Sequence, residues 1–185
     1  MKAHWLGILI AAFAAPAHAA FMDCIFFDGA DGESSGAPAN WRGHLQANNC
    51  ARKTVVPAAN PPMPLLHWSA SIAQTAQSYA NQCVWAHSGA AGLGENIYAA
   101  FPPAPDETAA ATSWLGETQY YNYNANSCAA GHDCGHYTQM VWRDTQQVGC
   151  GITTCTTGSP FGSGSWTFVV CDYSPPGNFN GQRPY

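Results

Sequence analysis

The amino-acid sequence predicts an α+β fold, and two observations favour this class. Segments with helical periodicity come first along the chain, whereas the segments richest in valine, threonine and aromatic residues come last. Helices and strands that are segregated along a chain are typical of α+β proteins. The length of 185 residues is enough to bury one sizeable core, so we expect a single main domain.

Three segments are expected to form helices. The first runs from Ala39 to Arg52, and the proline-rich residues 57–64 after it must form a loop, because proline disrupts regular structure. The second and clearest runs from Ser69 to about Trp85, where Ser69 or Ser71 can cap apolar residues at helical spacing. The third runs from Asp106, its expected cap, to about Tyr121.

Two later segments are expected to form strands. They run from Gln147 to Thr154 and from Trp166 to Tyr173, and both are rich in β-branched and aromatic residues. The segment from Tyr137 to Trp142 is too short for its periodicity to decide between helix and strand.

The charge composition excludes two kinds of partner. Only 9% of the residues are charged, the formal net charge is -5, and no cluster of lysine and arginine occurs. Nucleic acids and anionic lipid surfaces both select basic patches, so neither is an expected partner.

Residues 1–19 are expected to form a signal peptide. Lys2 gives the positive start, residues 5–15 the apolar stretch, and Ala17-His18-Ala19 a cleavage site of small residues. A membrane anchor is the alternative, but the apolar run is short and meets a proline. We therefore expect export, either secretion or delivery to the periplasm of a Gram-negative bacterium. An irregular arm at 20–38 and the main domain at 39–185 complete the expected organisation.

All the cysteines lie after the expected cleavage site. An even number of cysteines in an exported chain predicts disulfides, here four, although eight cysteines allow about 105 pairings. The cysteines are Cys24, Cys50, Cys83, Cys128, Cys134, Cys150, Cys155 and Cys171.

The segment at 135–142 is the sharpest functional lead. A histidine beside an element held by cysteines is a candidate metal ligand or proton carrier. The segment consists of Gly135, His136, Tyr137, Thr138, Gln139, Met140, Val141 and Trp142. Together with His87, Glu95 and Glu117, it predicts a cleft with two histidines and two glutamates.

These motifs resemble those of the CAP superfamily, named after cysteine-rich secretory proteins, antigen five and pathogenesis-related proteins of class one. Residues 135–142 and 171–181 resemble the two signatures of the family, and residues 87–88 with 94–97 resemble its other two motifs. Trp114 and Glu117, followed by two tyrosines, are similar to the plant members. The resemblance covers roughly residues 39–185.

The resemblance implies a three-layer α-β-α sandwich whose cleft carries the tetrad His87, Glu95, Glu117 and His136. It also implies the pairs Cys83–Cys155, Cys128–Cys134 and Cys150–Cys171, which leaves Cys24 and Cys50 for a fourth bridge to the arm. The chain departs from the family at Asn48-Asn49, where a His-Asn pair is frequent, and at Asp172, where plant relatives usually have asparagine.

Two imidazoles and two carboxylates can hold a divalent ion such as Zn²⁺. The alternative is that the tetrad only stabilises the cleft through hydrogen bonds and ion pairs. A competing structural zinc site would use Cys128, His132, Cys134 and His136, but in an oxidising compartment its cysteines should be bridged. His44 and His67 lie outside any motif and are expected to be structural or exposed.

The resemblance implies a secreted module that binds sterols, other lipids or extracellular protein ligands and acts in defence or in interactions between organisms. We expect it to be a monomer. Candidate contact residues are Phe101, Pro102, Pro103 and the cluster Tyr120–Tyr123. The alternative is a metal-dependent extracellular hydrolase, a peptidase or esterase, using Glu95, Glu117 and His136. No His-Glu-x-x-His motif supports that alternative. Residues 175–185 are also similar to a segment that plant relatives release as a peptide; otherwise they form a terminus held by Cys171.

Overall fold

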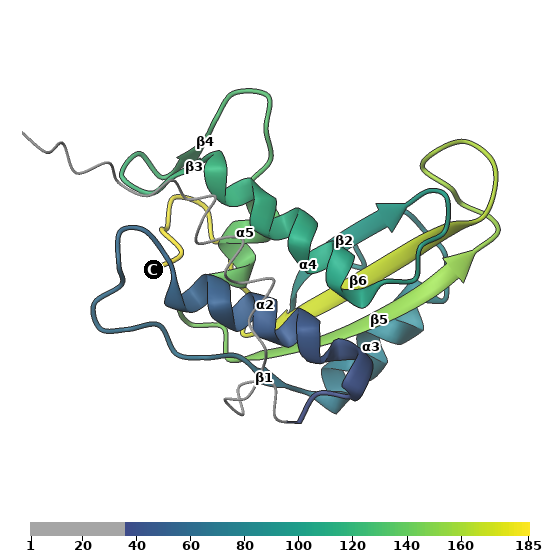
Figure 1. Ribbon diagram of the computed structural model, residues 1–185, viewed down its shortest axis with the longest axis horizontal. Coiled ribbons are helices and arrows are strands. Elements are labelled where there is room, and N and C mark those ends of the chain that lie inside the picture. Colours follow the sequence, from purple (N-terminus) through teal and green to yellow (C-terminus); the bar gives the residue numbers. More distant parts are fainter. Residues whose placement is uncertain (1–35) are drawn as a thin grey trace, which may run out of the picture.

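The computed structural model describes residues 36–185 (Figure 1). The predicted signal peptide, the arm up to residue 35 and Cys24 lie outside the described residues.

A mixed four-stranded sheet forms the middle of the molecule, with strand order β1-β5-β6-β2. The long strands β5 (Gln147–Cys155) and β6 (Trp166–Ser174) are antiparallel and confirm both predicted strands. The short strand β1 (His67–Trp68) runs parallel to β5. The strand β2 (Gly94–Ala100) was not expected from the sequence; it pairs antiparallel with β6 and lies at one edge of the sheet.

Helices cover both faces of this sheet, which confirms the three-layer α-β-α arrangement (Figure 1). One face carries α3 (Ala70–Ala80), and the other carries α2 (Arg42–Lys53), α4 (Glu107–Leu115) and the short α5 (Gly135–Met140). Glycines on β5 let α3 approach the sheet closely. A Cβ atom at Gly151 would lie 2.2 Å from the Cα of Gln77 in α3, so no larger residue fits without displacing the helix.

The side chains of β6 alternate between two separate cores, because successive residues of a strand point to opposite faces. Val169, Cys171 and Tyr173 pack with the residues of α2, α4 and α5. Phe168 and Val170 pack with the alanines of α3. Both faces of the sheet are therefore covered by apolar contacts, in agreement with an almost continuously buried β6.

The predicted helices begin where expected, but two of them end early. Ser69 caps α3 through its hydroxyl, and Asp106 caps α4 through its carboxylate. Instead of reaching Trp85, α3 ends at Ala80, because Cys83 adopts a left-handed conformation with φ 54°. Instead of reaching Tyr121, α4 ends at Leu115 and tightens into the 3-10 helix η2 (Gly116–Gln119).

The first helix is confirmed, with a 3-10 turn η1 (Ala39–Trp41) leading into α2. Two short strands, β3 (Tyr121–Asn122) and β4 (Ser127–Cys128), form a small hairpin between η2 and α5. None of the helices in residues 36–185 has the length and hydrophobicity needed to span a bilayer.

The three disulfide pairs implied by the resemblance are present. They are Cys83–Cys155, Cys128–Cys134 and Cys150–Cys171. Cys50 is also disulfide-bonded, and its expected partner Cys24 lies outside the described residues. The bridge at Cys134 holds the N-terminus of α5, the helix that carries the 135–142 motif.

A buried arginine fixes the position of α5. Arg52 of α2 is 1% exposed and donates hydrogen bonds to five backbone carbonyls. Its contacts with the carbonyls of Met140 and Trp142, at 3.1 and 2.7 Å, join the first helix to the end of α5. Burial, followed by the positive charge of Arg143, lowers the pKa of Arg52 to about 10.

The C-terminal residues are also bound to the domain. Arg143 donates its backbone N–H to the carbonyl of Pro184 at 2.7 Å, and the ring of Tyr185 stacks on Tyr123 at 4.5 Å. The tail therefore packs beside the β3–β4 hairpin.

Candidate functional site

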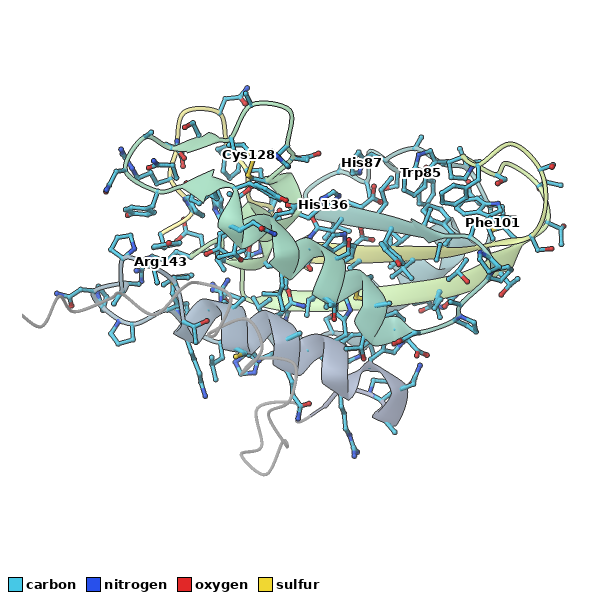
Figure 2. All side chains as sticks on the ribbon, turned by 45° about the horizontal axis from the view of Figure 1, so that its top comes forward. Trp85, His87, Phe101, Cys128, His136 and Arg143 are labelled. Atoms are coloured by element: carbon cyan, nitrogen blue, oxygen red, sulfur yellow. A yellow bond between two sulfur atoms is a disulfide. The ribbon has the colours of Figure 1, made fainter. Side chains whose placement is uncertain are left out.

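A cavity of about 500 Å³ runs along the edge of β2. In Figure 2, His136, His87, Trp85 and Phe101 follow one another along this strand. The cavity is lined by Trp85, His87, Ile97, Tyr98, Ala99, Ser113, Trp114, Glu117, Asp133, His136, Pro160 and Phe161. The predicted residues His87, Glu117 and His136 therefore share one cavity, although they come from three separate segments of the chain.

His136 is held rigidly on the helical wall of the cavity. It lies in the first turn of α5, and its Nδ1 is 2.5 Å from Oε1 of Glu117 in η2. The other carboxylate oxygen of Glu117 accepts the backbone N–H of Tyr137 at 2.9 Å. The imidazole also stacks on the buried Trp114, with ring centroids 5.7 Å apart. Both the orientation and the hydrogen-bonded nitrogen of His136 are thus set by its neighbours.

His87 is held in the same way by a glutamate of β2. Its Nδ1 lies 2.8 Å from Oε1 of Glu95, which also accepts the backbone N–H of Ser88 at 2.8 Å. The side chain of His87 is 62% exposed, whereas that of Glu95 is only 7% exposed. Glu95 does not line the cavity itself; it lies behind His87 and holds the imidazole ring through Nδ1.

A carboxylate at Nδ1 leaves Nε2 as the nitrogen that can bind a ligand or a metal ion. At both His136 and His87, this arrangement matches the common pattern in which a carboxylate that does not bind the metal orients a metal-binding imidazole. The ligand atoms of Glu117, Asp133 and His136 all lie within 4.8 Å of one another, and His87 is not part of this group. The sequence did not single out Asp133 as a site residue. The one feature that could have indicated it is its position two residues before the 135–142 motif.

A buried carboxyl pair lies behind His87. Glu95 and Asp172 are directly opposite each other on β2 and β6, and Asp172 is 1% exposed. Within residues 36–185, three carboxylate oxygens of this pair have no hydrogen-bond partner. They are both oxygens of Asp172 and Oε2 of Glu95. Burial, and then the charge of Glu95, raises the pKa of Asp172 to about 7. A proton on Asp172 gives this pair the donor that two ionised carboxylates lack.

The other histidines near sulfur atoms are structural. His44 is fully buried between the edges of Trp41 and Trp114, and burial lowers its pKa to about 4. It lies beside Cys150 and Cys171, but their sulfur atoms are bonded to each other and cannot bind a metal. The competing zinc site fails for the same reason, since Cys128 and Cys134 form a disulfide.

A second cavity of about 640 Å³ lies beside the β3–β4 hairpin. Its lining includes Val56, Pro57, Tyr120, Tyr121 and Tyr123. The tyrosine cluster from the sequence analysis is therefore at a cavity. The other candidates are elsewhere: Phe101 packs on Phe161 at the end of the first cavity, and neither Pro102 nor Pro103 lines one of these two cavities.

The layers, the disulfides and the cleft beside β2 define a disulfide-stabilised α-β-α sandwich of the CAP type. Residues 39–173 match the model of the cysteine-rich secretory protein family, and the chain belongs to this family.

Relatives within the family come from animals and plants. The chain is 41% identical over 142 residues to peptidase inhibitor 16 of Bos taurus. The matched region covers 76% of this chain but only 30% of that protein. It is 40% identical over 156 residues to the basic form of pathogenesis-related protein 1 of Nicotiana tabacum, covering 82% of this chain and 79% of the relative. Among solved structures, NaASP2 with Zn²⁺ has a TM-score of 0.63 and 26% identity, covering 82% and 87% of the two chains.

Proposed function

We propose that this chain is an extracellular binding domain whose cleft holds a divalent metal ion at His87 and His136. The observation that supports this most directly is the pairing of both imidazoles with carboxylates around one cavity. Glu95 and Glu117 orient the two rings in this proposal. The export signal predicted in residues 1–19 and the disulfides agree with an oxidising compartment.

The donor set fits Zn²⁺. Neutral imidazole nitrogens are good ligands for this ion, and Asp133 supplies a further oxygen near His136. Two histidines make an open site, so a bound ion would provide positions at which an external ligand can coordinate. The Zn²⁺ in the structure of NaASP2, a protein with the same fold, makes zinc the first ion to test.

A lipid or sterol is the second ligand in this proposal, at the second cavity. Tyr120, Tyr121 and Tyr123 give that cavity flat apolar surfaces with hydroxyl groups, and Val56 and Pro57 add aliphatic surface. A sterol combines a rigid apolar body with one hydroxyl group, so it suits such a lining.

A metal-dependent hydrolase is less well supported by the geometry. A hydrolase needs a carboxylate that can take a proton from water. Both oxygens of Glu117 already accept hydrogen bonds or pair with an imidazole, and Glu95 is behind His87. Among residues 36–185, only the carboxylate of Asp133 is left at the cavity for this role.

Calorimetric titration of the oxidised protein with Zn²⁺ tests the metal site. Wild type should release or take up heat in a saturable way, and the double variant His87→Ala/His136→Ala should not. His67→Ala is the matched control, because His67 is exposed and lies outside the cavity. Equal titrations for wild type and the double variant would refute the metal site. A cholesterol pull-down without saturable binding would refute the sterol ligand.

A further inference from the structure

The outer edge of β2 is open where it borders the cleft. Among the strands of residues 36–185, β2 pairs only with β6, and its residues Ile97, Tyr98 and Ala99 line the cavity. Within residues 36–185, no backbone hydrogen bond other than those to β6 involves these three residues. The outward-pointing N–H and C=O groups of this edge are therefore available to another strand.

One end of this edge is closed by a side chain. Asn96 is 1% exposed, and its amide donates to the backbone carbonyl of His136 at 3.1 Å. The available edge consequently begins at Ile97 and runs toward Ala100.

The open edge carries none of the usual protection against strand pairing. Exposed edges are commonly blocked by lysine, proline or a bulge, but residues 97–99 are isoleucine, tyrosine and alanine. Instead, the edge is recessed in a cavity of about 500 Å³. A recessed edge is difficult for another folded sheet to reach, whereas a single extended segment can enter it.

The two walls of the cavity differ in character. The wall near α4 and α5 carries the carboxylates of Glu117 and Asp133. On the opposite side, Trp85 is 41% exposed, and Phe161 at the end of the cavity is 50% exposed. No lysine or arginine of residues 36–185 lines the cavity.

The side chains of an added strand would point alternately to these two walls, because the side-chain period of a strand is two. Basic side chains complement the acidic wall, and apolar side chains complement the aromatic residues. Trp85 and Phe161 can accept either apolar contact or the aliphatic stem of a lysine.

We propose that the open edge of β2 binds an extended peptide segment with alternating basic and apolar residues, by adding it to the sheet as a fifth strand. This inference rests on the proposed function, in that it assigns a partner to the same binding cleft. The partner would be an exposed, extended segment of an extracellular protein.

The probe peptide acetyl-Val-Lys-Val-Lys-Val-amide tests this inference on the oxidised, full-length protein. We expect saturable binding together with slower hydrogen exchange at those amides of residues 97–99 that point away from β6. The same peptide with two alternate backbone nitrogens methylated should bind about tenfold more weakly or less, because it has lost edge hydrogen bonds. A peptide with glutamate in place of lysine should also bind less tightly.

A matched pair of variants tests the acidic wall. Asp133→Asn should weaken binding of the lysine peptide by about twofold to fivefold, the range for an exposed charge. The amide oxygen of asparagine can still accept the N–H of Gly135, which Asp133 accepts at 2.9 Å. Asp144→Asn removes the same charge from an exposed position outside the cavity and should have no effect.

Three results would overturn strand addition: no binding of the lysine peptide, binding without protection of β2, or equal affinity for the methylated peptide. The Zn²⁺ titration separates this inference from the proposed metal site. If wild type binds Zn²⁺ but not the peptide, strand addition is wrong and the metal site stands. If the peptide binds and protects β2 while Zn²⁺ does not bind, the metal site is wrong and strand addition stands.

Discussion

Asp172→Asn is expected to stabilise the protein above neutral pH. Asp172 faces Glu95 across the β2–β6 pair, and the two carboxyl groups are nearly excluded from water. An asparagine of similar shape can donate an N–H group to Oε2 of Glu95 at every pH, whereas Asp172 can donate only while it is protonated. The other ionisable groups near the pair are His87, which bonds to Glu95, and Tyr79 of α3 and Tyr173 of β6.

The magnitude follows from the raised pKa of Asp172. Its pKa is raised from 3.8 to about 7, a difference of about 3 pH units, which corresponds to about 4 kcal/mol. The unfolded chain loses this proton near pH 4, but the folded protein retains it until about pH 7. The stability of wild type should therefore decrease as pH rises from 4 to 7, and the full loss should be present at pH 8.

Urea denaturation of both proteins at several pH values measures this difference. The variant should be more stable than wild type by up to about 4 kcal/mol at pH 8, and the gap should close toward pH 4.5. The contribution of His44, whose lowered pKa makes both proteins less stable in acid, cancels in the comparison. A difference between the two proteins that does not change with pH would refute the reasoning.

The remaining predictions concern the scaffold around the cleft. Arg52→Met should cost about 3–5 kcal/mol in urea denaturation, because five backbone carbonyls, three of them in buried hydrogen bonds, lose their donor; a cost below about 1 kcal/mol would contradict this. Gly151→Ala should cost about 1–3 kcal/mol, since its new methyl group would meet the backbone of Gln77, and the crystal structure of the variant should show α3 displaced from β5. Replacing Cys83 and Cys155 by serine opens a bridge with a sequence separation of 72, and the midpoint of urea unfolding should fall by an amount equivalent to about 4 kcal/mol. An unchanged midpoint would show that this bridge contributes nothing to stability.

Local sequence signals predicted the starts of helices better than their ends. A capping side chain acts within three residues of its own position, and Ser69 and Asp106 do so as expected. The end of α3 depends instead on Cys83, whose partner Cys155 is at the far end of β5. The helical pattern continued past this point in the sequence, so the pattern alone could not indicate where the helix stops.

The edge strand β2 was missed for a related reason. Apart from the buried Asn96, its residues are only partly buried, and glycine, asparagine and alanine weaken the pattern of a strand. The strand exists because seven of its residues pair with β6, more than sixty positions later in the chain. A contact over that distance leaves no periodic signal in the segment itself.

The sequence by itself determined the fold class, the helix starts, the two long strands and, through its family motifs, three disulfide pairs and the residues to examine at the cleft. Only the tertiary structure decided that Asp172 faces Glu95, that Asp133 lies beside His136, and that the edge of β2 opens into the cavity. The physical reason is register: which residues face each other across two strands depends on the alignment of distant segments, and a shift by one residue would turn each side chain to the opposite face.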